Sequence, residues 1–534
     1  MRNMTTVSDD SARQPEPDPE IRVIADIARV NASRYPEAEA VVHAGRRLTW
    51  SQLDARVVQL ANALRDELDV EPGARVSAIA ENCLEYFEFY HGTAVAGVIA
   101  VPLNQRLALE ELADIAERVD PKVLFHDAAH LEQAESLRDR LGCRLVPIGD
   151  AMSDSASTTY DSLLAAASTN RPQYRPEPGD PATICFTGGT TGLPKGCVIS
   201  HGALIEFGRM IQLAQGVRLH DRHLFVRPMA VAPGHRMVSW HGVTAGCTVI
   251  ANRFEAGEFY RMVEQERCTN TLLSPTMFQM LLDHGNPEGY VVGSLRSVGY
   301  GGAPITPDLL AQVVEVFGCE LHQNYGGSEA ASATHLTPAD HQAGRLDSIG
   351  RALPGIDVEV VDADGNVLPP GGAGEIIVRG SQLFSRYWGN ENATNEVLRD
   401  GYYWTGDLAT RDAEGYLRLV GRTKDLIISG GYNVYPIEVE NALAEHPAVR
   451  DVAVIGIPDR KWGEAVHAVI VLADGQTPDA DGLVEHCRSR IASYKKPRSI
   501  EFVDELPRTT VGKIAKNVLR DRHAALDGQQ SGPR

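Results

Sequence analysis

The sequence predicts an α/β protein: a large N-terminal domain of helix-covered, largely parallel sheets with a small antiparallel unit, followed by a smaller α+β domain. Three observations support this fold class. A chain of 534 residues is too long for one hydrophobic core, so two or more domains are expected. From Ile24 onward, helical and strand patterns alternate, as they do in parallel sheets covered by helices. After Gly355 the pattern changes to short strands separated by turns that contain Gly and Pro.

The N-terminal elements show this alternation directly. Residues 1–19 lack periodicity, and we expect a disordered tail there. Ser51 is predicted to cap a helix over 52–68, whose apolar stripe has helical spacing. Strands are predicted over 75–80 and 98–102, with a helix between them. This is the pattern of a βαβ unit, which implies parallel strands.

The later segments complete the domain plan. Residues 151–180, rich first in Ser and Ala and then in Pro, are predicted to form a connector. Residues 355–380 are expected to form the small antiparallel unit. Beyond Gly421 the predicted elements are a helix from Pro436, strands over 452–457 and 465–472, and a helix over 483–492. About 110 residues suffice for a small α+β domain.

Composition and charge narrow the classes of partner. The formal net charge of −20 disfavours nucleic acid and anionic membranes, and it requires a local cluster of positive groups wherever an anionic substrate binds. No apolar stretch approaches the roughly 20 residues that span a bilayer, and the N-terminus lacks the apolar core of a secretory signal. The eight cysteines are scattered without a C-x-x-C pair. We therefore expect a cytoplasmic protein with reduced thiols and without membrane insertion.

The most informative segment is the loop 187–196, Thr-Gly-Gly-Thr-Thr-Gly-Leu-Pro-Lys-Gly. Glycines let backbone N–H groups converge on one point, and threonine hydroxyls and a lysine ammonium add further donors. Such a set of donors suits the polyphosphate of a nucleotide. The spacing is not that of a Walker A loop, because no G-x-x-x-x-G-K-[ST] pattern fits it. The residues expected to hold phosphate are Thr187, Gly188, Gly189, Thr190, Thr191, Gly192 and Lys195.

Four further segments follow this loop in the order of one family's motifs. They are 324–329 (Asn-Tyr-Gly-Gly-Ser-Glu), 403–407 (Tyr-Trp-Thr-Gly-Asp), 421–440 (beginning Gly-Arg-Thr-Lys-Asp) and 507–513 (Pro-Arg-Thr-Thr-Val-Gly-Lys). Over residues 20 to 525 the chain resembles the adenylate-forming (AMP-binding) superfamily of acyl-CoA synthetases, luciferases and peptide-synthetase adenylation domains, in its acid–CoA ligase branch. The resemblance implies an N-terminal domain over 20–421, a hinge over 422–425, a mobile C-terminal domain over 426–525 and a disordered tail over 526–534.

The resemblance also implies an acyl-CoA ligase that uses ATP, Mg²⁺ and coenzyme A. A small-molecule carboxylic acid attacks the α-phosphate of ATP, and the acyl-AMP then passes its acyl group to the thiol of CoA. Such a reaction depends mostly on charge neutralisation and positioning. By resemblance, Lys513 bridges the carboxylate and the α-phosphate, Glu329 binds Mg²⁺, and Ser328 hydrogen-bonds the α-phosphate.

The remaining nucleotide and CoA contacts are assigned in the same way. Tyr325 is expected to stack on adenine, and Asp407 to accept both ribose hydroxyls beside Arg422. Lys424 holds the hinge position, about which the C-terminal domain rotates after adenylation. The other residues assigned to the nucleotide are Gly302, Ala303, Pro304, Asn324 and Gly326, and those assigned to CoA are Gly430, Gly431 and Tyr432.

The acyl group is expected to be bulky. No acidic residue lies between Arg227 and Phe254 to pair with a substrate ammonium, so an amino acid is disfavoured. Small residues predict a roomy, apolar pocket for an aromatic, polycyclic or medium-to-long acyl acid, with His235 and Arg236 either meeting a polar substituent or facing outward. The residues assigned to this pocket are Ala230, Val231, Ala232, Gly234, His235, Gly299, Tyr300, Gly326 and Gly327.

Three positions depart from the family pattern and leave alternatives open. Gly188 stands where Ser is usual, Ser328 where Thr is usual, and Val231 where many members have His or an aromatic residue. These changes fit neutral drift, or an enzyme weak in adenylation that mainly converts a preformed acyl-AMP to the CoA thioester. A carrier-protein acyl ligase, a luciferase-like oxidase and a non-enzymatic nucleotide-binding protein are further alternatives. The sequence also leaves a homodimer open.

Overall fold

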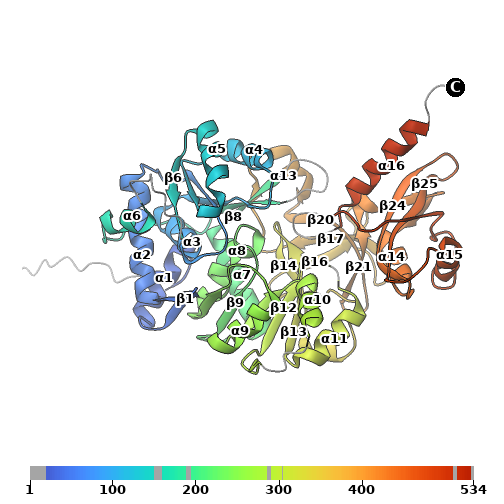
Figure 1. Ribbon diagram of the computed structural model, residues 1–534, viewed down its shortest axis with the longest axis horizontal. Coiled ribbons are helices and arrows are strands. Elements are labelled where there is room, and N and C mark those ends of the chain that lie inside the picture. The colour runs from blue at the N-terminus through green and yellow to red at the C-terminus, as the bar shows by residue number, and fades with distance from the viewer. Residues whose placement is uncertain are drawn as a thin grey trace, which may run out of the picture.

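The computed structural model describes residues 20–149, 159–187, 194–285, 290–303, 305–508 and 514–530, with side chains as far as residue 523. The tail expected over 1–19 lies outside these residues. Three sheets and their helices form the larger part of the molecule, and a fourth sheet with α14 (Pro436–Ala444), α15 (Ala480–Arg488) and α16 (Lys516–Gln530) lies to one side (Figure 1). The α/β fold class predicted from the sequence is confirmed.

A seven-stranded sheet carries the glycine-rich loop. Its strands, in sheet order, are β18 (Arg386–Tyr387), β8 (Lys195–Ser200), β7 (Pro181–Thr187), β4 (Ile99–Pro102), β3 (Arg75–Ile79), β5 (Val123–His126) and β6 (Arg144–Pro147). Strands β7, β4, β3, β5 and β6 are parallel, whereas β8 runs antiparallel to β7 and to β18. The predicted βαβ unit is therefore present, with α3 (Leu84–Ala96) between the parallel strands β3 and β4.

A nine-stranded sheet lies beside it. Its order is β15 (Arg351–Ala352), β14 (Ala331–Leu336), β13 (Glu320–Gly327), β12 (Ser297–Gly301), β11 (Asn270–Leu273), β9 (Arg222–Phe225), β10 (Cys247–Ile250), β1 (Glu39–His43) and β2 (Arg46–Thr49). The central run from β13 to β1 is parallel, and the pairings at both ends are antiparallel. Because parallel strands share one carboxyl edge, the segments that follow β9, β12 and β13 meet there.

Two smaller sheets complete the chain. The first is antiparallel and contains β16 (Asp357–Val361), β17 (Ala373–Arg379), β20 (Tyr402–Arg411) and β19 (Leu398–Arg399), with β21 (Leu417–Arg422) also paired to β20. The second contains β23 (Tyr432–Val434), β22 (Ile427–Ser429), β25 (Gly463–Leu472) and β24 (Val449–Asp459), with β26 (Ser499–Phe502) parallel to β25. The antiparallel unit expected near 355–380 is thus confirmed.

The helices pack on these sheets and bury their apolar faces. The remaining helices are α1 (Ile24–Arg34), α2 (Trp50–Asn62), α4 (Leu109–Val119), α5 (Leu131–Leu141), α6 (Tyr160–Ala166), α7 (His201–Gln215), α8 (Ala232–Trp240), α9 (Ala256–Glu266), α10 (Pro275–His284), α11 (Pro307–Phe317), α12 (Pro338–Gln342) and α13 (Glu391–Val397). No helix among the described residues is long and apolar enough to cross a membrane. All eight cysteines are free thiols.

Four local predictions need correction. The cap of α2 is Thr49 rather than Ser51, because the Thr49 hydroxyl accepts from the Gln52 backbone N–H while the Gln52 side chain binds back to Thr49. The connector over 151–180 contains α6, which Thr159 caps in the same way. Asp479 caps α15, so this helix spans 480–488 instead of 483–492. Helix α16 continues to Gln530, so residues 526–530 are helical and not part of a tail.

Candidate active site

The ends of the glycine-rich loop are held together by the β7–β8 hairpin. Thr187 pairs with Lys195 in the strand register, and the Thr187 hydroxyl donates to the Lys195 carbonyl at 3.4 Å. The Lys195 ammonium lies 5.0 Å from the centre of the Tyr387 ring, and the Tyr387 hydroxyl donates to Glu329 Oε1 at 2.9 Å. The structure therefore joins the loop to the acidic motif through one aromatic ring. Gly188, Gly189, Thr190, Thr191 and Gly192 lie outside the described residues.

Tyr387 is a site residue that sequence reasoning missed. It is 58 residues from Glu329 in the chain and belongs to no motif, so only the pairing of β18 with β8 brings it to the site. Burial, and then the Glu329 carboxylate, raise the pKa of the Tyr387 hydroxyl, so it stays protonated and donates.

A buried arginine fixes the turn that carries Ser328. Arg236 on α8 donates to the carbonyl oxygens of Gly327 at 3.1 Å and Ser328 at 2.7 Å. It faces inward, as does His235, which is 1% exposed. Within the described part of the chain, the two buried ring nitrogens of His235 have no hydrogen-bond partner. Burial lowers the pKa of His235 well below its usual range, so the ring is neutral. Of the two orientations left open by the sequence, the structure has the inward one.

Tyr325, Asp407 and Arg422 form one hydrogen-bonded chain across two sheets. The Tyr325 hydroxyl donates to Asp407 Oδ2 at 2.8 Å, and Arg422 Nε donates to Asp407 Oδ1 at 2.6 Å. Asp407 and Arg422 are direct partners in the β20–β21 register, while Tyr325 is 82 residues from Asp407 in the chain. Burial alone lowers the pKa of Arg422, but the Asp407 carboxylate outweighs it and the net pKa is raised. Asp407 thus contacts both Arg422, which the family resemblance places with it at the ribose, and Tyr325, which the resemblance places at adenine.

Two glycines assigned to the acyl pocket instead allow close backbone packing. A Cβ at Gly326 would stand 1.8 Å from the carbonyl oxygen of Ala331, and one at Gly234 would stand 1.8 Å from that of Met229. The small side chain at each position is required by the neighbouring main chain and leaves no extra room. The inference from small residues to a roomy pocket is therefore wrong at Gly234 and Gly326.

Tyr300 also lies away from the position expected for it. Its side chain is 1% exposed, packs in the core below α10 and α11, and its hydroxyl is 2.8 Å from His341 Nε2. Successive side chains of a strand alternate between faces, so Gly299 and Gly301 face the other way. Ala230 is likewise a core residue, 4% exposed. Val231, Ala232 and Gly327 are at least partly exposed and remain candidates for the pocket.

One residue assigned to adenine carries a buried side-chain oxygen that accepts no hydrogen bond from the described residues. This oxygen is Asn324 Oδ1. Gly302, which follows β12, has a φ of +86° that favours glycine, and Ala303 follows it. Pro304 lies outside the described residues. The guanidinium of Arg227 lies against Gly302, a neighbour that no motif predicted.

The hinge segment is anchored on both sides by ion pairs. Arg422 binds Asp407 of β20, and Asp425 binds Arg520 of α16 at 2.7 Å. Lys424 lies between them in a 3₁₀ turn over Thr423–Asp425. Burial, and then the Arg422 charge, lower the pKa of Lys424. One anchor therefore holds each side of the expected pivot.

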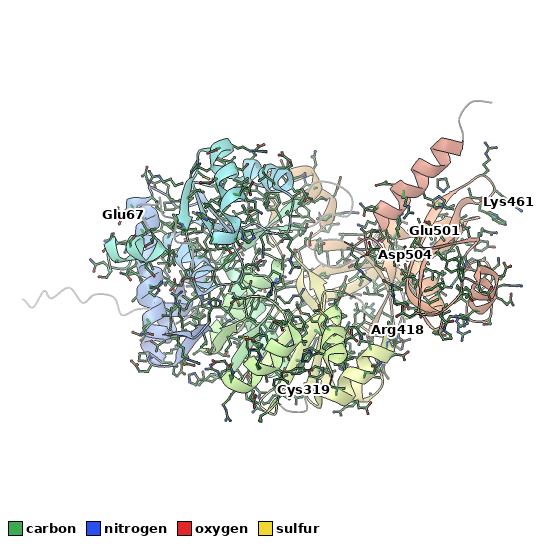
Figure 2. All side chains as sticks on the ribbon, in the orientation of Figure 1. Glu67, Cys319, Arg418, Lys461, Glu501 and Asp504 are labelled. Atoms are coloured by element: carbon green, nitrogen blue, oxygen red, sulfur yellow. The ribbon has the colours of Figure 1, made fainter. Side chains whose placement is uncertain are left out.

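The residues assigned to CoA form a tight hairpin. Gly430 and Gly431 connect β22 to β23, and both have positive φ, at +61° and +82°. Tyr432 is 62% exposed and its ring lies 5.0 Å from that of Tyr494. The hairpin abuts Trp462 at the turn between β24 and β25, whose neighbour Lys461 projects at the outer end of this sheet (Figure 2).

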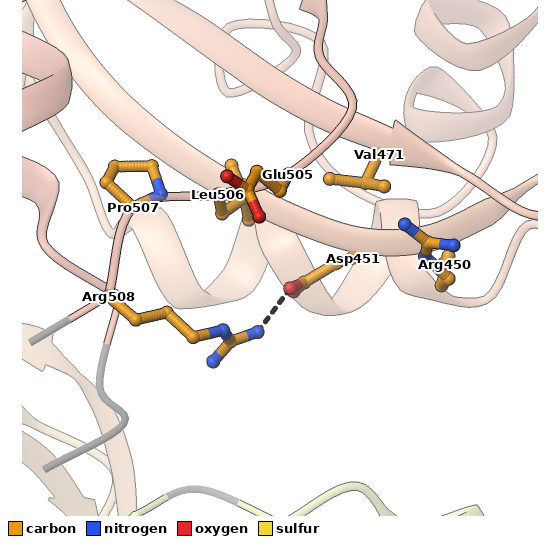
Figure 3. Close-up of a pocket in the computed structure, with 7 residues that line it drawn as sticks. All are labelled: Arg450, Asp451, Val471, Glu505, Leu506, Pro507 and Arg508. Carbon is orange, nitrogen blue, oxygen red and sulfur yellow. Dashed lines mark hydrogen bonds and ion pairs between the residues drawn. The ribbon is translucent and has the colours of Figure 1, made fainter.

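Lys513 lies outside the described residues, but both ends of its loop are in place. Arg508 pairs with Ile514 in an antiparallel bridge, and the Ala515 N–H donates to the Pro507 carbonyl at 2.8 Å. Arg508 also forms an ion pair with Asp451 beside an open recess of about 440 Å³ (Figure 3). The recess is lined by Arg450, Asp451, Val471, Glu505, Leu506, Pro507 and Arg508. The residues on either side of 509–513 are therefore held close together, by the Arg508–Ile514 bridge and by the Arg508–Asp451 ion pair to β24.

Comparison with known proteins covers both parts of the chain. Residues 28–388 match the family model described as AMP-binding enzyme, and residues 438–513 match the model of the AMP-binding enzyme C-terminal domain. A feruloyl-CoA synthase of Amycolatopsis sp is 38% identical over 92% of this chain and 97% of its own. An indoleacetate–CoA ligase of Aromatoleum aromaticum is 36% identical, over 92% and 94%. The amide bond synthetase McbA of Marinactinospora thermotolerans superposes with a TM-score of 0.84 at 32% identity, over 93% and 99%.

Proposed function

The chain belongs to the AMP-binding enzyme family, and from this membership we propose that it is an acyl-CoA ligase that forms AMP. An oxygen of the acid's carboxylate attacks the α-phosphorus of ATP and pyrophosphate leaves. The CoA thiolate then attacks the carbonyl carbon of the acyl-AMP, and AMP leaves. The observation that carries the proposal is the contact of Tyr325, Asp407 and Arg422, because it gathers ribose-type partners from distant segments.

The nucleotide is proposed to lie across the edges of three sheets. Asp407 accepts the ribose hydroxyls, held in place by Arg422 and Tyr325. The unsatisfied Asn324 Oδ1 accepts from the exocyclic amine of adenine, which would pair an otherwise costly buried acceptor. The loop that begins at Thr187 binds the β- and γ-phosphates.

Magnesium fits the acidic motif. Glu329 presents one carboxylate, with Oε1 oriented by Tyr387 and Oε2 lying 3.5 Å from the Cβ position of Gly327. A single protein carboxylate with the remaining ligands from phosphate and water is the usual arrangement for Mg²⁺. The ion would neutralise phosphate charge there, while Lys195, whose ammonium lies 5.0 Å from the centre of the Tyr387 ring, adds a second positive group.

We also propose that the C-terminal part rotates between the two half-reactions. The proposed units are an N-terminal domain over 20–421, a hinge over 422–425 and a C-terminal domain from 426, which α16 extends to Gln530. The two ion pairs that flank Lys424 give each domain a fixed end at the hinge, so rotation need change only the turn between them. Lys513 acts in adenylation, and the hairpin at Gly430 acts in thioester formation.

The substrate is proposed to be a bulky carboxylic acid that is not an amino acid. The segment 228–253 contains no carboxylate to pair with an ammonium group, and the buried His235 is neutral. An acid library tests this directly, with acyl-AMP and acyl thioester scored separately by mass spectrometry. Parallel reactions with CoA, a phosphopantetheinyl carrier protein or an amine as acceptor distinguish the three kinds of product. Absence of acyl-AMP with every acid would overturn the proposal.

The alternative of an enzyme weak in adenylation depends on Gly188 and Val231. If the missing hydroxyl at Gly188 weakens pyrophosphate positioning, the wild type should exchange ATP and pyrophosphate slowly yet convert synthetic acyl-AMP rapidly. Gly188→Ser should then raise the adenylation rate roughly ten- to a hundredfold, the value of one hydrogen bond to a charged group. Brisk exchange by the wild type with its own acid would eliminate this alternative.

A further inference from the structure

Arg227 is an arginine at the candidate site that no motif assigns. It follows β9 at the carboxyl edge of the parallel strands, the edge at which β12 is followed by Gly302. Its guanidinium nitrogens Nη2 and Nη1 lie 3.6 and 3.8 Å from the Cβ position of Gly302. The positive group therefore lies directly against the segment assigned to the nucleotide.

The backbone around Arg227 is rigidly held. Asn82 donates to the Arg227 carbonyl at 2.8 Å and accepts from the Met229 N–H at 2.7 Å. Tyr90 on α3 donates to the Met229 carbonyl at 2.6 Å, and the missing side chain of Gly234 lets α8 approach the same carbonyl. With the main chain held by Asn82 and from α3 and α8, the fold fixes the point from which the Arg227 side chain extends.

No hydrogen bond or ion pair is found for the guanidinium of Arg227 within the described part of the chain. Burial lowers its pKa to about 10, and no carboxylate counters this effect. The neighbouring cations differ: Arg422 is bound to Asp407, and Arg236 is bound to two carbonyl oxygens. The Arg227 side chain is half-buried, so its guanidinium has lost part of its hydration without gaining a partner among the described residues. This arrangement favours a partner that arrives with the substrates.

We propose that Arg227 binds the carboxylate of the acid substrate and presents it to the α-phosphate. The proposal rests on the acyl-AMP reaction proposed above. The carboxylate is an anion that must approach a polyphosphate in a protein of net charge −20. Lys513 is assigned to bridge the two groups as the bond forms, and a second cation would bind the carboxylate before that step. Among the arginines described at this site, Arg227 is the one without a protein partner, and its planar fork suits a carboxylate. It is thereby a specificity residue that selects carboxylates over uncharged analogues.

The test compares Arg227→Met with the matched control Arg218→Met. Arg218 is exposed and precedes β9, so it lies at the opposite edge of the same sheet. The probes are ferulate, indole-3-acetate or whichever library acid the wild type adenylates fastest, together with its primary amide as an uncharged analogue. The dissociation constants of acid, amide and ATP are measured by calorimetry, and acyl-AMP formation by mass spectrometry.

Arg227→Met should weaken binding of the acid about ten- to a hundredfold, the range for a charge-assisted hydrogen bond. The ratio of its affinities for the acid and the amide should fall by the same factor. Its dissociation constant for ATP should stay within about twofold of the wild-type value. Arg218→Met should match the wild type in all three affinities. Without substrates, the melting temperature of Arg227→Met should equal or exceed that of the wild type, because the substitution breaks no hydrogen bond or ion pair within the described part of the chain and removes a partly desolvated charge.

Three results would overturn the inference. They are unchanged acid affinity, a loss of ATP affinity instead, and a lower melting temperature without substrates, which would reveal a protein partner for the guanidinium. If the wild type forms acyl-AMP and Arg227→Met keeps its acid preference, this inference fails alone. If the wild type forms no acyl-AMP from any acid, the proposed function fails.

Discussion

Two adjacent glycines in the β22–β23 hairpin should respond very differently to the same substitution. A Cβ at Gly430 would stand 2.7 and 3.1 Å from ring atoms of Trp462, whereas nothing lies within 4 Å of a Cβ at Gly431. The Trp462 ring cannot retreat easily, because Arg498 lies 4.1 Å from its centre. Gly430→Ala therefore combines overpacking with a left-handed backbone, and Gly431→Ala has only the backbone strain.

The magnitudes follow from these contacts. An L side chain in the left-handed region costs about 1–2 kcal/mol, and overpacking adds about 1–3 kcal/mol. Gly430→Ala should lose about 2–5 kcal/mol of local stability and Gly431→Ala about 1–2 kcal/mol. Amide hydrogen exchange of the peptide that spans 427–434 measures this loss of local stability, since a loss of about 1.4 kcal/mol corresponds to tenfold faster exchange. Equal exchange in the two variants, or faster exchange in Gly431→Ala, would refute the geometric reasoning.

The same open space allows a functional test at Gly431. Gly431→Trp should fold, because nothing lies within 4 Å of a Cβ at this position, yet it should narrow the path of the pantetheine arm if this hairpin borders it. We expect acyl-AMP to accumulate while thioester formation fails. Single-turnover reactions with and without CoA measure both species. Undiminished thioester formation, together with an intact hairpin by hydrogen exchange, would remove this loop from the CoA site.

Three further predictions concern charge. Lys513→Ala should slow acyl-AMP formation by about 3 kcal/mol of transition-state stabilisation while sparing conversion of supplied acyl-AMP, and equal loss in both half-reactions would contradict its assignment. Glu329→Gln should raise the Mg²⁺ concentration needed for ATP–pyrophosphate exchange. Tyr387→Phe should raise it less, because this variant keeps the Glu329 carboxylate. An unaltered Mg²⁺ dependence in Glu329→Gln would exclude Glu329 as a magnesium ligand. Burial lowers the pKa of His322 to about 3 and the pKa of His335 to about 4. Because the pKa of histidine in an unfolded chain is about 6.5, protons bind the unfolded state first as the pH falls. The free energy of unfolding should therefore decrease as the pH drops from about 6.5 towards 4. Thermal melts across this interval should show a weaker decline for His322→Asn, and an identical decline would show that other groups dominate.

Predictions from sequence succeeded where the controlling interactions are local. The strands predicted over 75–80 and 98–102, the helix from Pro436 and the antiparallel unit near 355–380 follow from alternation, helix-start and turn signals within a few residues. Errors appear at element ends, where one side chain decides the boundary: Thr49 rather than Ser51 caps α2, and Asp479 starts α15 three residues early.

The sequence by itself determined the order of the motifs and hence the family, since glycine content and the spacing of Lys, Glu and Asp are properties of the linear chain. Only the tertiary structure decided which partner each of these residues meets. Tyr387 reaches Glu329 across 58 residues, and Arg236 reaches the Ser328 carbonyl across 92. It also decided that Gly326 accommodates a neighbouring carbonyl rather than an acyl chain. Such contacts depend on strand register and helix packing, which no local pattern encodes.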